Sequence, residues 1–410
     1  MKKLEVWFLG WGQRWLLGTL AHSGAHTLFE YSPEALRRGV RHSELSLPLA
    51  ARTYAKLPDF FGGLPGFVAD ALPDGWGLLL MDRVVRKAGR DPAMLTALDR
   101  LAFVGTRAMG ALAFEPPADL ELEAEDLSLR ALAEAARDVI EDRDTRALTT
   151  LALVGGSPHG ARPKVLVNFD PATRTIGTAP DSPGTPWIVK FPARGEHVEV
   201  CGIEFAYAQA ARLAGIEVPA THHFVALGPK LAAFGSERFD RHRGLRVPVQ
   251  SFAAVLHADF RLPALDYEAV LQATRFMTAS APEVSKAFLR CVFNVVFNHK
   301  DDHAKNLALR MDERMEWKLS PAYDMAFDAG PGGCHQTSVM GEARHPAREH
   351  LLALARACDV PKATALRCID VVCDVAQTLD ALLDEGEVRK ATRRAIGRVV
   401  EENAVRCRLA

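Results

Sequence analysis

An aspartate and an asparagine, Asp301 and Asn306, stand five positions apart directly after a long apolar segment. This Asp-x-x-x-x-Asn spacing is typical of the kinase catalytic loop, where the aspartate takes a proton from the acceptor hydroxyl and the asparagine holds magnesium. Asp302 lies one residue too close to Asn306 for the same role. It is expected to hold Lys300 or Lys305, or to contact the acceptor. The alternative is that these acids are solvated loop residues.

The neighbouring segments have the order that such a loop needs. A helical apolar stripe precedes the loop and consists of Val284, Phe288, Cys291, Val292, Val295 and Val296. After the loop, residues 307–311 and 315–319 are predicted to form a two-stranded hairpin around a polar turn. Asp324 follows, where a kinase places the aspartate that bridges magnesium to the phosphates. This order favours a catalytic site over solvated acids.

Upstream segments could serve the phosphates of a nucleotide. Residues 153–164 form a glycine-rich turn, and glycines let backbone N–H groups approach phosphate oxygens. Lys190 lies in an apolar strand pattern over 186–192, and Glu204 lies near the start of a helical pattern over 202–214. A strand lysine followed by a helix glutamate matches the ion pair that orients a kinase lysine. The alternatives are a hairpin turn, an edge lysine and a glutamate placed for the helix dipole.

Taken together, these segments resemble the HipA family of serine/threonine kinases, the toxin halves of bacterial toxin–antitoxin pairs. The matching segments are a phosphate loop at 155–164, a nucleotide lysine at 188–192, a hinge at 237–241, a catalytic loop at 298–306 and a metal aspartate at 323–324. The first region also matches, at 29–31, 45–49, 60–65 and 110–112. The resemblance therefore covers nearly the whole chain.

The resemblance implies a site for ATP and Mg²⁺. Its catalytic residues would be Asp301, as base, and Lys305, because His303 stands where protein kinases keep a lysine near the γ-phosphate. The implied nucleotide contacts are Ser157, His159, Gly160, Ala161, Lys190, Glu237, Phe239, His303, Asn306 and Asp324. Of these, Asn306 and Asp324 would also hold the metal. Backbone groups of Glu237 and Phe239 would contact the adenine.

At two positions the sequence differs from the kinase pattern, which limits the roles that the resemblance can assign. Asp324 is followed by Met325 and Ala326 rather than by Phe-Gly, so a switch based on that phenylalanine has no counterpart. His159 is bulky for a phosphate loop, and it is expected to point outward or to gate the nucleotide. The family's self-phosphorylated serine falls on Ser157, where a phosphate would add negative charge to a site for anions. Alternatively, Ser157 only hydrogen-bonds to the backbone of the turn.

The biological role follows from the resemblance alone. It implies a growth-inhibiting toxin, linked to persistence, that phosphorylates a protein such as an aminoacyl-tRNA synthetase. Its regulators would be an antitoxin of helix-turn-helix type and autophosphorylation. The chain has 50 Lys and Arg against 51 Asp and Glu, so no general field attracts nucleic acid. DNA contact is therefore expected only through the antitoxin.

Composition indicates a cytoplasmic protein without a membrane segment. Seven cysteines, an odd number without a C-x-x-C pair, suit a reducing compartment. Residues 1–17 resemble a signal peptide only superficially, because Glu5, Gln13 and Arg14 interrupt the apolar stretch. They are predicted to form two strands with a turn at 10–12. No run of about 20 uncharged apolar residues is present.

The predicted fold is α+β and protein-kinase-like, with two lobes and an N-terminal α/β accessory subdomain. The accessory subdomain is predicted at 1–118, a small β-rich nucleotide lobe at 119–249 and a helical catalytic lobe at 250–410. The nucleotide lobe would begin with an acidic linker at 119–126 and a helix at 127–140. Further helices are predicted at 78–87, 267–276, 349–358, 363–383 and 390–404.

Two rival functions belong to other classes. The first is metal-dependent hydrolysis with His299, His303, Asp301 and Asp302 as ligands, which no H-E-x-x-H motif supports. The second is a non-catalytic, pseudokinase-like binding protein whose N-terminal region docks a regulator. A scaffold need not retain a lysine, two aspartates and an asparagine in the kinase order. Magnesium-dependent transfer of labelled γ-phosphate would separate the three hypotheses.

Overall fold

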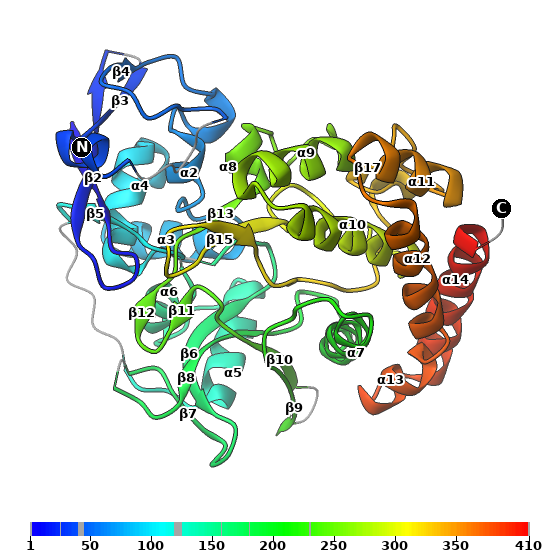
Figure 1. Cartoon of the computed structure of the whole chain (residues 1–410). Helices are drawn as coiled ribbons and strands as arrows, with labels where there is room; N and C mark the ends of the chain where they lie inside the picture. Colours follow the sequence, from blue (N-terminus) through cyan, green and yellow to red (C-terminus); the bar gives the residue numbers. More distant parts are fainter. Residues whose placement is uncertain are drawn as a thin grey trace. The chain divides into compact units, whose positions relative to one another are not determined.

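The computed structural model describes residues 2–24, 26–39, 45–118, 125–156, 158–179, 181–228 and 231–408 (Figure 1). Its contacts divide the chain into two compact units. We name Met1–Val198 with His222–Val249 the sheet unit, and Glu199–Thr221 with Gln250–Ala410 the helical unit. The predicted α+β class, with a sheet-rich part and a helical part, is confirmed.

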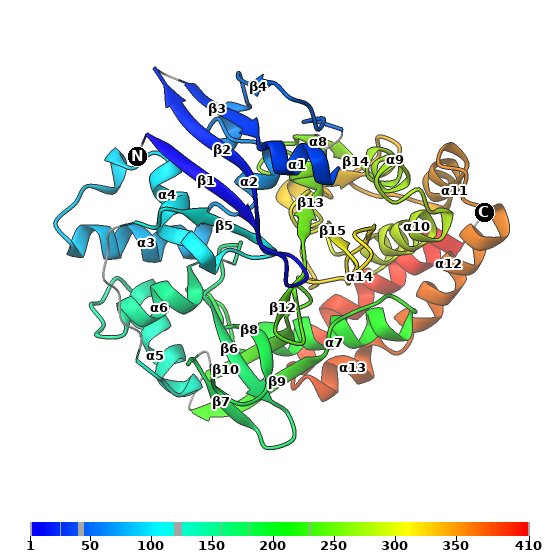
Figure 2. The ribbon, with the colours of Figure 1, turned by 60° about the vertical axis from the view of Figure 1, so that its left-hand side comes forward.

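The sheet unit opens with a five-stranded sheet in the order β4-β3-β2-β1-β5. Its strands are β1 (Lys3–Phe8), β2 (Trp15–Ser23), β3 (His26–Tyr31), β4 (Thr53–Tyr54) and β5 (Leu112–Glu115). The predicted first two strands and their turn are confirmed, since β1 and β2 pair antiparallel around Gly10–Gly12. The helices of this region are α1 (Pro33–Arg38), α2 (Gly66–Ala69), α3 (Gly75–Lys87) and α4 (Ala97–Val104). Figure 2 shows α3 and α4 beside this sheet.

A second five-stranded sheet of the same unit has the order β7-β6-β8-β10-β9. Its strands are β6 (Lys164–Asp170), β7 (Thr175–Gly177), β8 (Thr185–Lys190), β9 (Thr221–Gly228) and β10 (Leu231–Glu237). Two helices, α5 (Leu129–Ile140) and α6 (Leu148–Gly155), share one apolar core with this sheet and with α3. A short hairpin follows, made by β11 (Arg241–His242) and β12 (Leu245–Arg246). Thus α3, from the first region, helps to build the core of the second sheet.

The helical unit is built around α10 (Ala281–Val296), which carries most of its apolar residues inward. The other helices are α7 (Glu199–Leu213), α8 (Phe252–Leu256), α9 (Tyr267–Thr278), α11 (Arg348–Ala357), α12 (Lys362–Ala376), α13 (Leu379–Glu385) and α14 (Lys390–Arg408). The predicted hairpin after the catalytic loop is confirmed as β15 (Ala308–Met311) and β16 (Trp317–Leu319). The remaining strands are β13 (Val249–Ser251), at the border of the units, β14 (Leu265–Asp266) and β17 (Thr337–Ser338).

One helix prediction needs a correction. The periodic segment 363–383 is two helices, because α12 ends at Ala376 and α13 begins at Leu379. The break is a hydrogen-bonded turn in which the hydroxyl of Thr378 donates to the carbonyl of Val375, over 2.8 Å. Leu379 and Leu383 remain buried after the turn, so the apolar period continues although the helix does not.

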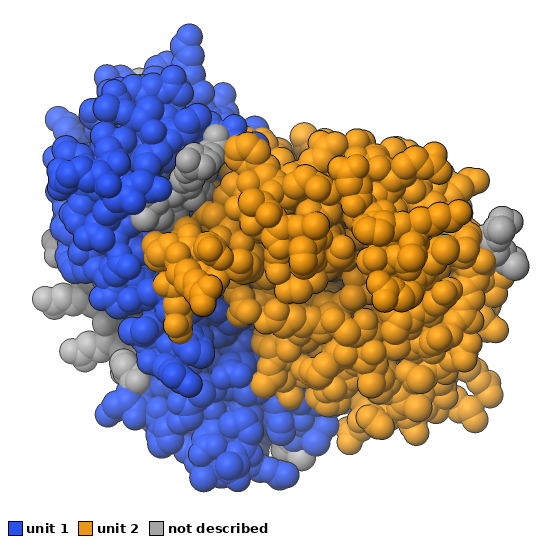
Figure 3. Space-filling view, in the orientation of Figure 1, with its two compact units in different colours: residues 1–198, 222–249 blue, residues 199–221, 250–410 orange. Residues whose placement is uncertain are grey.

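The chain passes between the units more than once, since α7 lies in the helical unit while the strands on either side of it lie in the sheet unit. Figure 3 draws the two units in different colours. The division at 118, 249 and 410 stays a prediction. Most of the predicted acidic linker, residues 119–124, lies outside the described residues. Among the described helices, none combines the length and the apolar character needed to cross a bilayer.

Candidate active site

The catalytic loop begins where α10 ends. The side-chain amide of Asn403, on α14, donates to the carbonyl of Val295 over 3.2 Å and to the Asn298 side-chain oxygen over 3.3 Å. The hydroxyl of Tyr207, on α7, donates to the carbonyl of Phe297 over 2.7 Å. Asn298 has a positive φ of 53°, which asparagine tolerates better than most residues. Two other helices therefore fix the start of the loop.

Asp301 is held on two sides. The amide nitrogen of Asn306 donates to its carbonyl over 2.7 Å, which closes the loop. The side-chain amide of Gln336 donates to its Oδ1 atom over 2.7 Å, and the His303 Nε2 atom lies 3.8 Å from that oxygen. The Asp301 side chain is still 46% exposed, so its carboxylate can reach a solute.

A second acid, Asp324, affects the pKa of Asp301. Desolvation is the main cause that raises the pKa of Asp301 from 3.8 to about 6, and the negative charge of Asp324 raises it further. His299 acts in the opposite direction. Such a pair of neighbouring carboxylates resists double ionisation unless a cation lies between them. Asp301 and Asp324, 23 positions apart in sequence, therefore form one electrostatic group.

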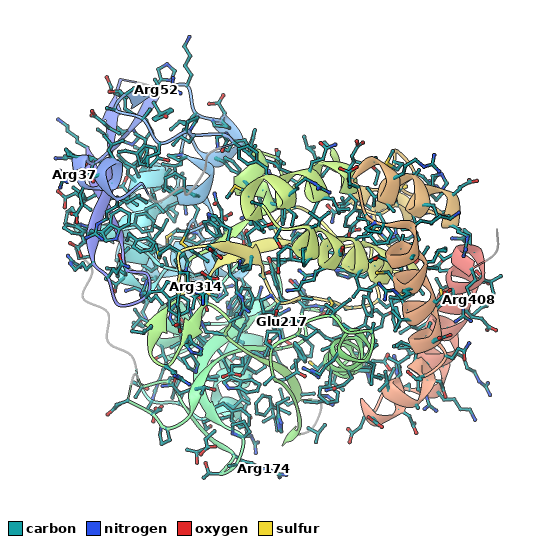
Figure 4. All side chains as sticks on the ribbon, in the orientation of Figure 1. Arg37, Arg52, Arg174, Glu217, Arg314 and Arg408 are labelled. Atoms are coloured by element: carbon teal, nitrogen blue, oxygen red, sulfur yellow. The ribbon has the colours of Figure 1, made fainter. Side chains whose placement is uncertain are left out.

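Asp324 has a positive φ of 55°, an unusual conformation for an aspartate. The residues before it are anchored: Tyr323 donates its hydroxyl to the carbonyl of Lys305 over 2.6 Å, and Ala322 donates its N–H to the carbonyl of Glu217 over 2.7 Å. The Glu217 carboxylate (Figure 4) also pairs with Arg310 of β15 at 2.7 Å. These bonds hold the segment that presents Asp324 against the hairpin and the catalytic loop.

Asp302 has a different role from the one expected. Its side chain is fully buried and accepts hydrogen bonds from Tyr267 over 3.0 Å and from the backbone N–H of Gln336 over 2.9 Å. Its Oδ2 atom lies 2.9 Å from His335 Nδ1. Lys300 instead donates to the carbonyls of Gly333 and Arg344. Asp302 therefore does not hold Lys300, but ties the segment 335–337 to the catalytic loop.

The expected catalytic lysine and its neighbouring histidine lie inside the loop. The Lys305 side chain is buried, and its Nζ atom lies 4.1 Å from the ring centroid of Phe260. The ring of His303 is 5.8 Å from the same phenylalanine, and its Nδ1 atom accepts the N–H of Lys305 over 3.2 Å. The apolar ring of Phe260 thus fixes where both side chains can lie.

The donor set around Asp301 and Asp324 suits a hard cation. Asn306 uses its amide nitrogen on the Asp301 carbonyl, which leaves its Oδ1 atom as the atom able to ligate. An amide oxygen and a carboxylate are ligands that Mg²⁺ accepts, with water and phosphate completing its shell. Within the described ranges, no cluster of three or more His, Cys, Asp or Glu side chains is placed to hold a metal. His299 faces the backbone of Ala326, at 2.9 Å from its carbonyl.

The glycine-rich loop belongs to the sheet unit and runs from α6 to β6. It follows a helix, so it is not the hairpin turn considered as an alternative. Lys164 donates its ammonium group to the carbonyl of His159, and Gly160 adopts a φ of 101° that glycine alone adopts readily. Ala161 follows in the same turn. Ser157 lies outside the described residues.

Lys190 ends β8, where its Cα is paired directly with that of Lys164 on β6. Side chains alternate along these strands, and Val165 and Val189 point into the apolar core. The two lysines therefore share the opposite face. Lys190 also lies 5.9 Å from the ring centroid of Phe234 on β10.

The expected hinge follows β10, which ends at Glu237. Arg238 donates its backbone N–H to Pro186 over 2.9 Å, and its guanidinium holds the buried Asp240 through two bonds of 2.8 Å. Phe239 lies between these two residues in sequence. Asp240 in turn accepts the backbone N–H of Gly110 over 2.7 Å. The segment with Glu237 and Phe239 is thus locked to the first region by buried charges.

The structure brings together five of the predicted site residues within the helical unit. They are Asp301, His303, Lys305, Asn306 and Asp324. In the sheet unit, His159, Gly160, Ala161 and Lys190 lie at the glycine-rich loop and the adjoining strand, and Glu237 and Phe239 lie at the end of β10. Glu204 is buried on α7, in the helical unit, so the Lys190–Glu204 ion pair stays a prediction.

Sequence reasoning missed Gln336, Asp74 and Trp76. Gln336 contacts Asp301 from a segment without any motif, so no signal pointed to it. Asp74 and Trp76 contact the glycine-rich loop, and the run Asp74-Gly75-Trp76-Gly77 did carry a signal in its two closely spaced glycines.

Comparisons with known proteins identify the family of this chain. Residues 156–379 match a family model described as HipA-like C-terminal domain, and residues 5–115 match one described as HipA N-terminal domain. The protein named "Putative kinase Y4dM" from Sinorhizobium fredii is 30% identical over 154 residues, which are 35% of this chain and 37% of that protein. The match therefore spans little more than a third of this relative's length.

A solved structure has the same fold over nearly the full length. It is the complex of HipA, HipB and operator DNA from the toxin–antitoxin system of Shewanella oneidensis MR-1. The match has a TM-score of 0.70 and a sequence identity of 17%, and it covers 98% of this chain and 97% of that one. At this identity the match establishes the fold.

Proposed function

Because this chain belongs to the HipA family, we propose that it is an ATP- and Mg²⁺-dependent serine/threonine protein kinase. One observation carries the proposal: Asn306 is bonded to the backbone of Asp301, and Tyr323, the residue before Asp324, is bonded to Lys305 of the same loop. This combination supplies a base and two metal ligands in the order that phosphoryl transfer uses.

In this proposal Asp301 accepts the proton of the substrate hydroxyl as the hydroxyl oxygen attacks the γ-phosphorus, and the bond from that phosphorus to the bridging oxygen breaks to release ADP. Asn306 and Asp324 would hold Mg²⁺, which would neutralise charge on the phosphates. Lys305 offsets the negative charge that develops near the γ-phosphate, while His303 orients Lys305. Gln336 keeps one oxygen of Asp301 occupied, so the other is available to the acceptor.

The phosphates are assigned to the glycine-rich loop and to Lys190. Support comes from the register of the sheet, which pairs Lys190 directly with Lys164 at the end of the glycine-rich loop and so gives the two side chains the same face. His159, Gly160 and Ala161 would line the phosphates, and backbone groups of Glu237 and Phe239 would bind the adenine. Autophosphorylation of Ser157 would add a charge of about −1.5 to −2 to this loop and so oppose nucleotide binding.

The test is transfer of labelled γ-phosphate to serine and threonine residues, with and without Mg²⁺. We expect transfer by the wild type and transfer about 100- to 10,000-fold slower by Asp301→Asn, with ATP binding retained by both. Tight ATP binding without any transfer would instead favour the pseudokinase-like alternative. Intact-mass analysis after incubation with Mg-ATP should add one phosphate that maps to Ser157 and is absent in Asp301→Asn.

We further propose that the chain is a growth-inhibiting toxin, restrained by an antitoxin of helix-turn-helix type. The target would be a protein such as an aminoacyl-tRNA synthetase. Phosphoproteomics after brief induction, with Asp301→Asn as control, identifies it. The near-zero net charge implies weak DNA binding by the chain alone, and tight operator binding only with a basic dimeric partner. Sequence-specific retention of DNA by the isolated chain would contradict this.

A further inference from the structure

The glycine-rich loop rests on a corner of the first region, the four residues Asp74-Gly75-Trp76-Gly77 at the start of α3. Asp74 accepts the N–H of Gly160 at its Oδ1 atom over 2.7 Å, and the N–H of Trp76 donates to the carbonyl of Gly160 over 3.0 Å. Gly160 is thus bonded through both of its backbone groups to residues more than 80 positions earlier.

A third bond fixes the end of the loop. The indole Nε1 of the buried Trp76 donates to the carbonyl of Lys164 over 2.9 Å. Lys164 is the first residue of β6, and its own ammonium group donates back to the carbonyl of His159. Trp76 therefore joins the loop to the apolar core that α3 shares with the second sheet.

The two glycines of the corner are required by close approach. A Cβ on Gly77 would lie 2.5 Å from the carbonyl oxygen of Gly156, and a Cβ on Gly75 would lie 2.5 Å from that of Gly160. Gly75 also has a positive φ of 42°. Both contacts are with backbone, which cannot move aside as a flexible side chain would. The corner thus touches the loop at both ends of the segment 157–159.

Asp74 is the helix N-cap residue of α3, yet its side chain makes no capping bond to its own helix. An aspartate in this position usually accepts the amides of the first turn. Here its carboxylate makes a charge-assisted bond to the loop instead, a class of hydrogen bond stronger than a neutral one. The position of Asp74 is therefore better explained by the loop than by the helix.

We infer that Asp74, Trp76 and Gly77 are positioning residues for the nucleotide phosphates: they hold the glycine-rich loop in the conformation that binds them. This rests on the proposed function, and it extends that function to a segment outside the nucleotide-binding motifs. A loop that is already ordered pays less conformational entropy on binding, so loss of its anchors weakens binding. The adenine contacts proposed at Glu237 and Phe239 lie on another segment.

The experiment compares ATP with adenosine, because only ATP has phosphates to place in the loop. Calorimetric titration of the full chain gives both affinities for the wild type, Asp74→Ala, Asp74→Asn and Gly77→Ala. Asp82→Ala is the matched control for Asp74, since it removes an ion pair with Arg100 at 2.9 Å from the same helix. Gly397→Ala is the matched control for Gly77, because a Cβ there meets nothing within 4 Å.

We expect Asp74→Ala to weaken ATP binding at least about tenfold, the loss of one hydrogen bond to a charged group, with adenosine affinity unchanged. Gly77→Ala should also weaken ATP binding and spare adenosine, because its Cβ would displace the loop at Gly156. Asp74→Asn should recover most of the ATP affinity, because its amide oxygen can accept the same N–H. Both controls should bind like the wild type. Equal losses for ATP and adenosine, or no loss in Asp74→Ala, would overturn the inference.

Hydrogen exchange in the nucleotide-free protein separates this inference from the proposed function. The amide of Gly160 should exchange faster in Asp74→Ala than in the wild type or Asp82→Ala, while the amides of α10 keep their protection. Unchanged exchange at Gly160 would overturn the anchoring itself. If the wild type binds no ATP, the proposed function fails and the phosphate role of the corner fails with it, whatever the exchange result.

Discussion

The side-chain amide of Gln336 donates a hydrogen bond to the Asp301 carboxylate over 2.7 Å, across 35 positions of sequence. The backbone N–H of the same glutamine donates to Asp302 over 2.9 Å. Two consecutive aspartates thus bond to one glutamine, Asp301 to its side chain and Asp302 to its backbone. The buried Asp302 sets where Gln336 lies, and Gln336 sets how the carboxylate of Asp301 is turned.

Gln336→Ala should therefore lower kcat about tenfold or more, the effect of one hydrogen bond to a charged group, without changing KM for ATP. Gln336→Glu places a second carboxylate against Asp301, so its activity should rise only at higher pH than that of the wild type. Steady-state kinetics against pH measure both effects. Gln272→Ala is the control, because Gln272 makes a similar bond to Glu268 on the exposed surface of α9. A parallel change in KM and kcat for Gln336→Ala would argue against orientation.

Replacement of the proposed base and metal ligand should separate binding from transfer. Asp301→Asn should reduce transfer about 100- to 10,000-fold, the usual contribution of a general base, and leave ATP affinity within a few-fold. Asp324→Ala should also weaken the binding of Mg-ATP, because it removes a metal ligand. Titration with and without Mg²⁺ distinguishes the two variants. Wild-type turnover in Asp301→Asn would refute the assignment.

The raised pKa of Asp301, about 6 in the metal-free protein, predicts a pH-dependent stability. A carboxyl whose folded-state pKa lies above its unfolded value of 3.8 favours folding only while it is protonated. That contribution is complete below about pH 3.8 and is lost as the pH rises through 6. Asp301→Asn should hence raise Tm at pH 7 and leave it unchanged near pH 4.

The same carboxyl can be followed directly. Its titration in the metal-free protein, observed by carbon NMR, should have a midpoint near pH 6. Asp324→Asn should move the midpoint to lower pH, since the negative charge of Asp324 is one of the causes of the shift. A midpoint that does not change in this variant would show that the two carboxylates do not interact.

The buried charges beside the hinge predict a large loss of stability. Burial alone would raise the pKa of Asp240, but the charges of Arg238 and Arg241 hold it well below its usual range. Asp240→Asn leaves these guanidinium groups without their anion and should cost about 3–5 kcal/mol in unfolding free energy. Chemical denaturation measures this. Glu115→Gln, which breaks an exposed pair with Arg14, should cost only about 0–1 kcal/mol.

Local patterns predicted much of the fold. The stripe before Asp301 became α10, and the polar turn at 312–314 joined β15 to β16, because periodicity and turn residues act over a few positions. The break at Thr378 was not predicted, since the apolar period runs through it and only a turn of hydrogen bonds marks it. Sequence patterns therefore located elements better than their ends.

The site was predicted where its residues are close in sequence. Asp301 and Asn306 share one loop, so their spacing alone indicated contact. Asp302 was misjudged because its partners, Tyr267 and His335, come from more than 30 positions away on either side. Spacing carries no information about such contacts, which depend on how distant segments pack.

The placement of α7 has a consequence for the order in which the protein can fold during synthesis. Every residue of the sheet unit has been made once Val249 has been added, whereas α7, which is made before that point, belongs to the helical unit. Its buried Tyr207 packs on Phe293 and Phe297, and its Gly202 lies against Gly386. The ribosome must therefore add well over 100 further residues before this helix can meet its last partner in the helical unit.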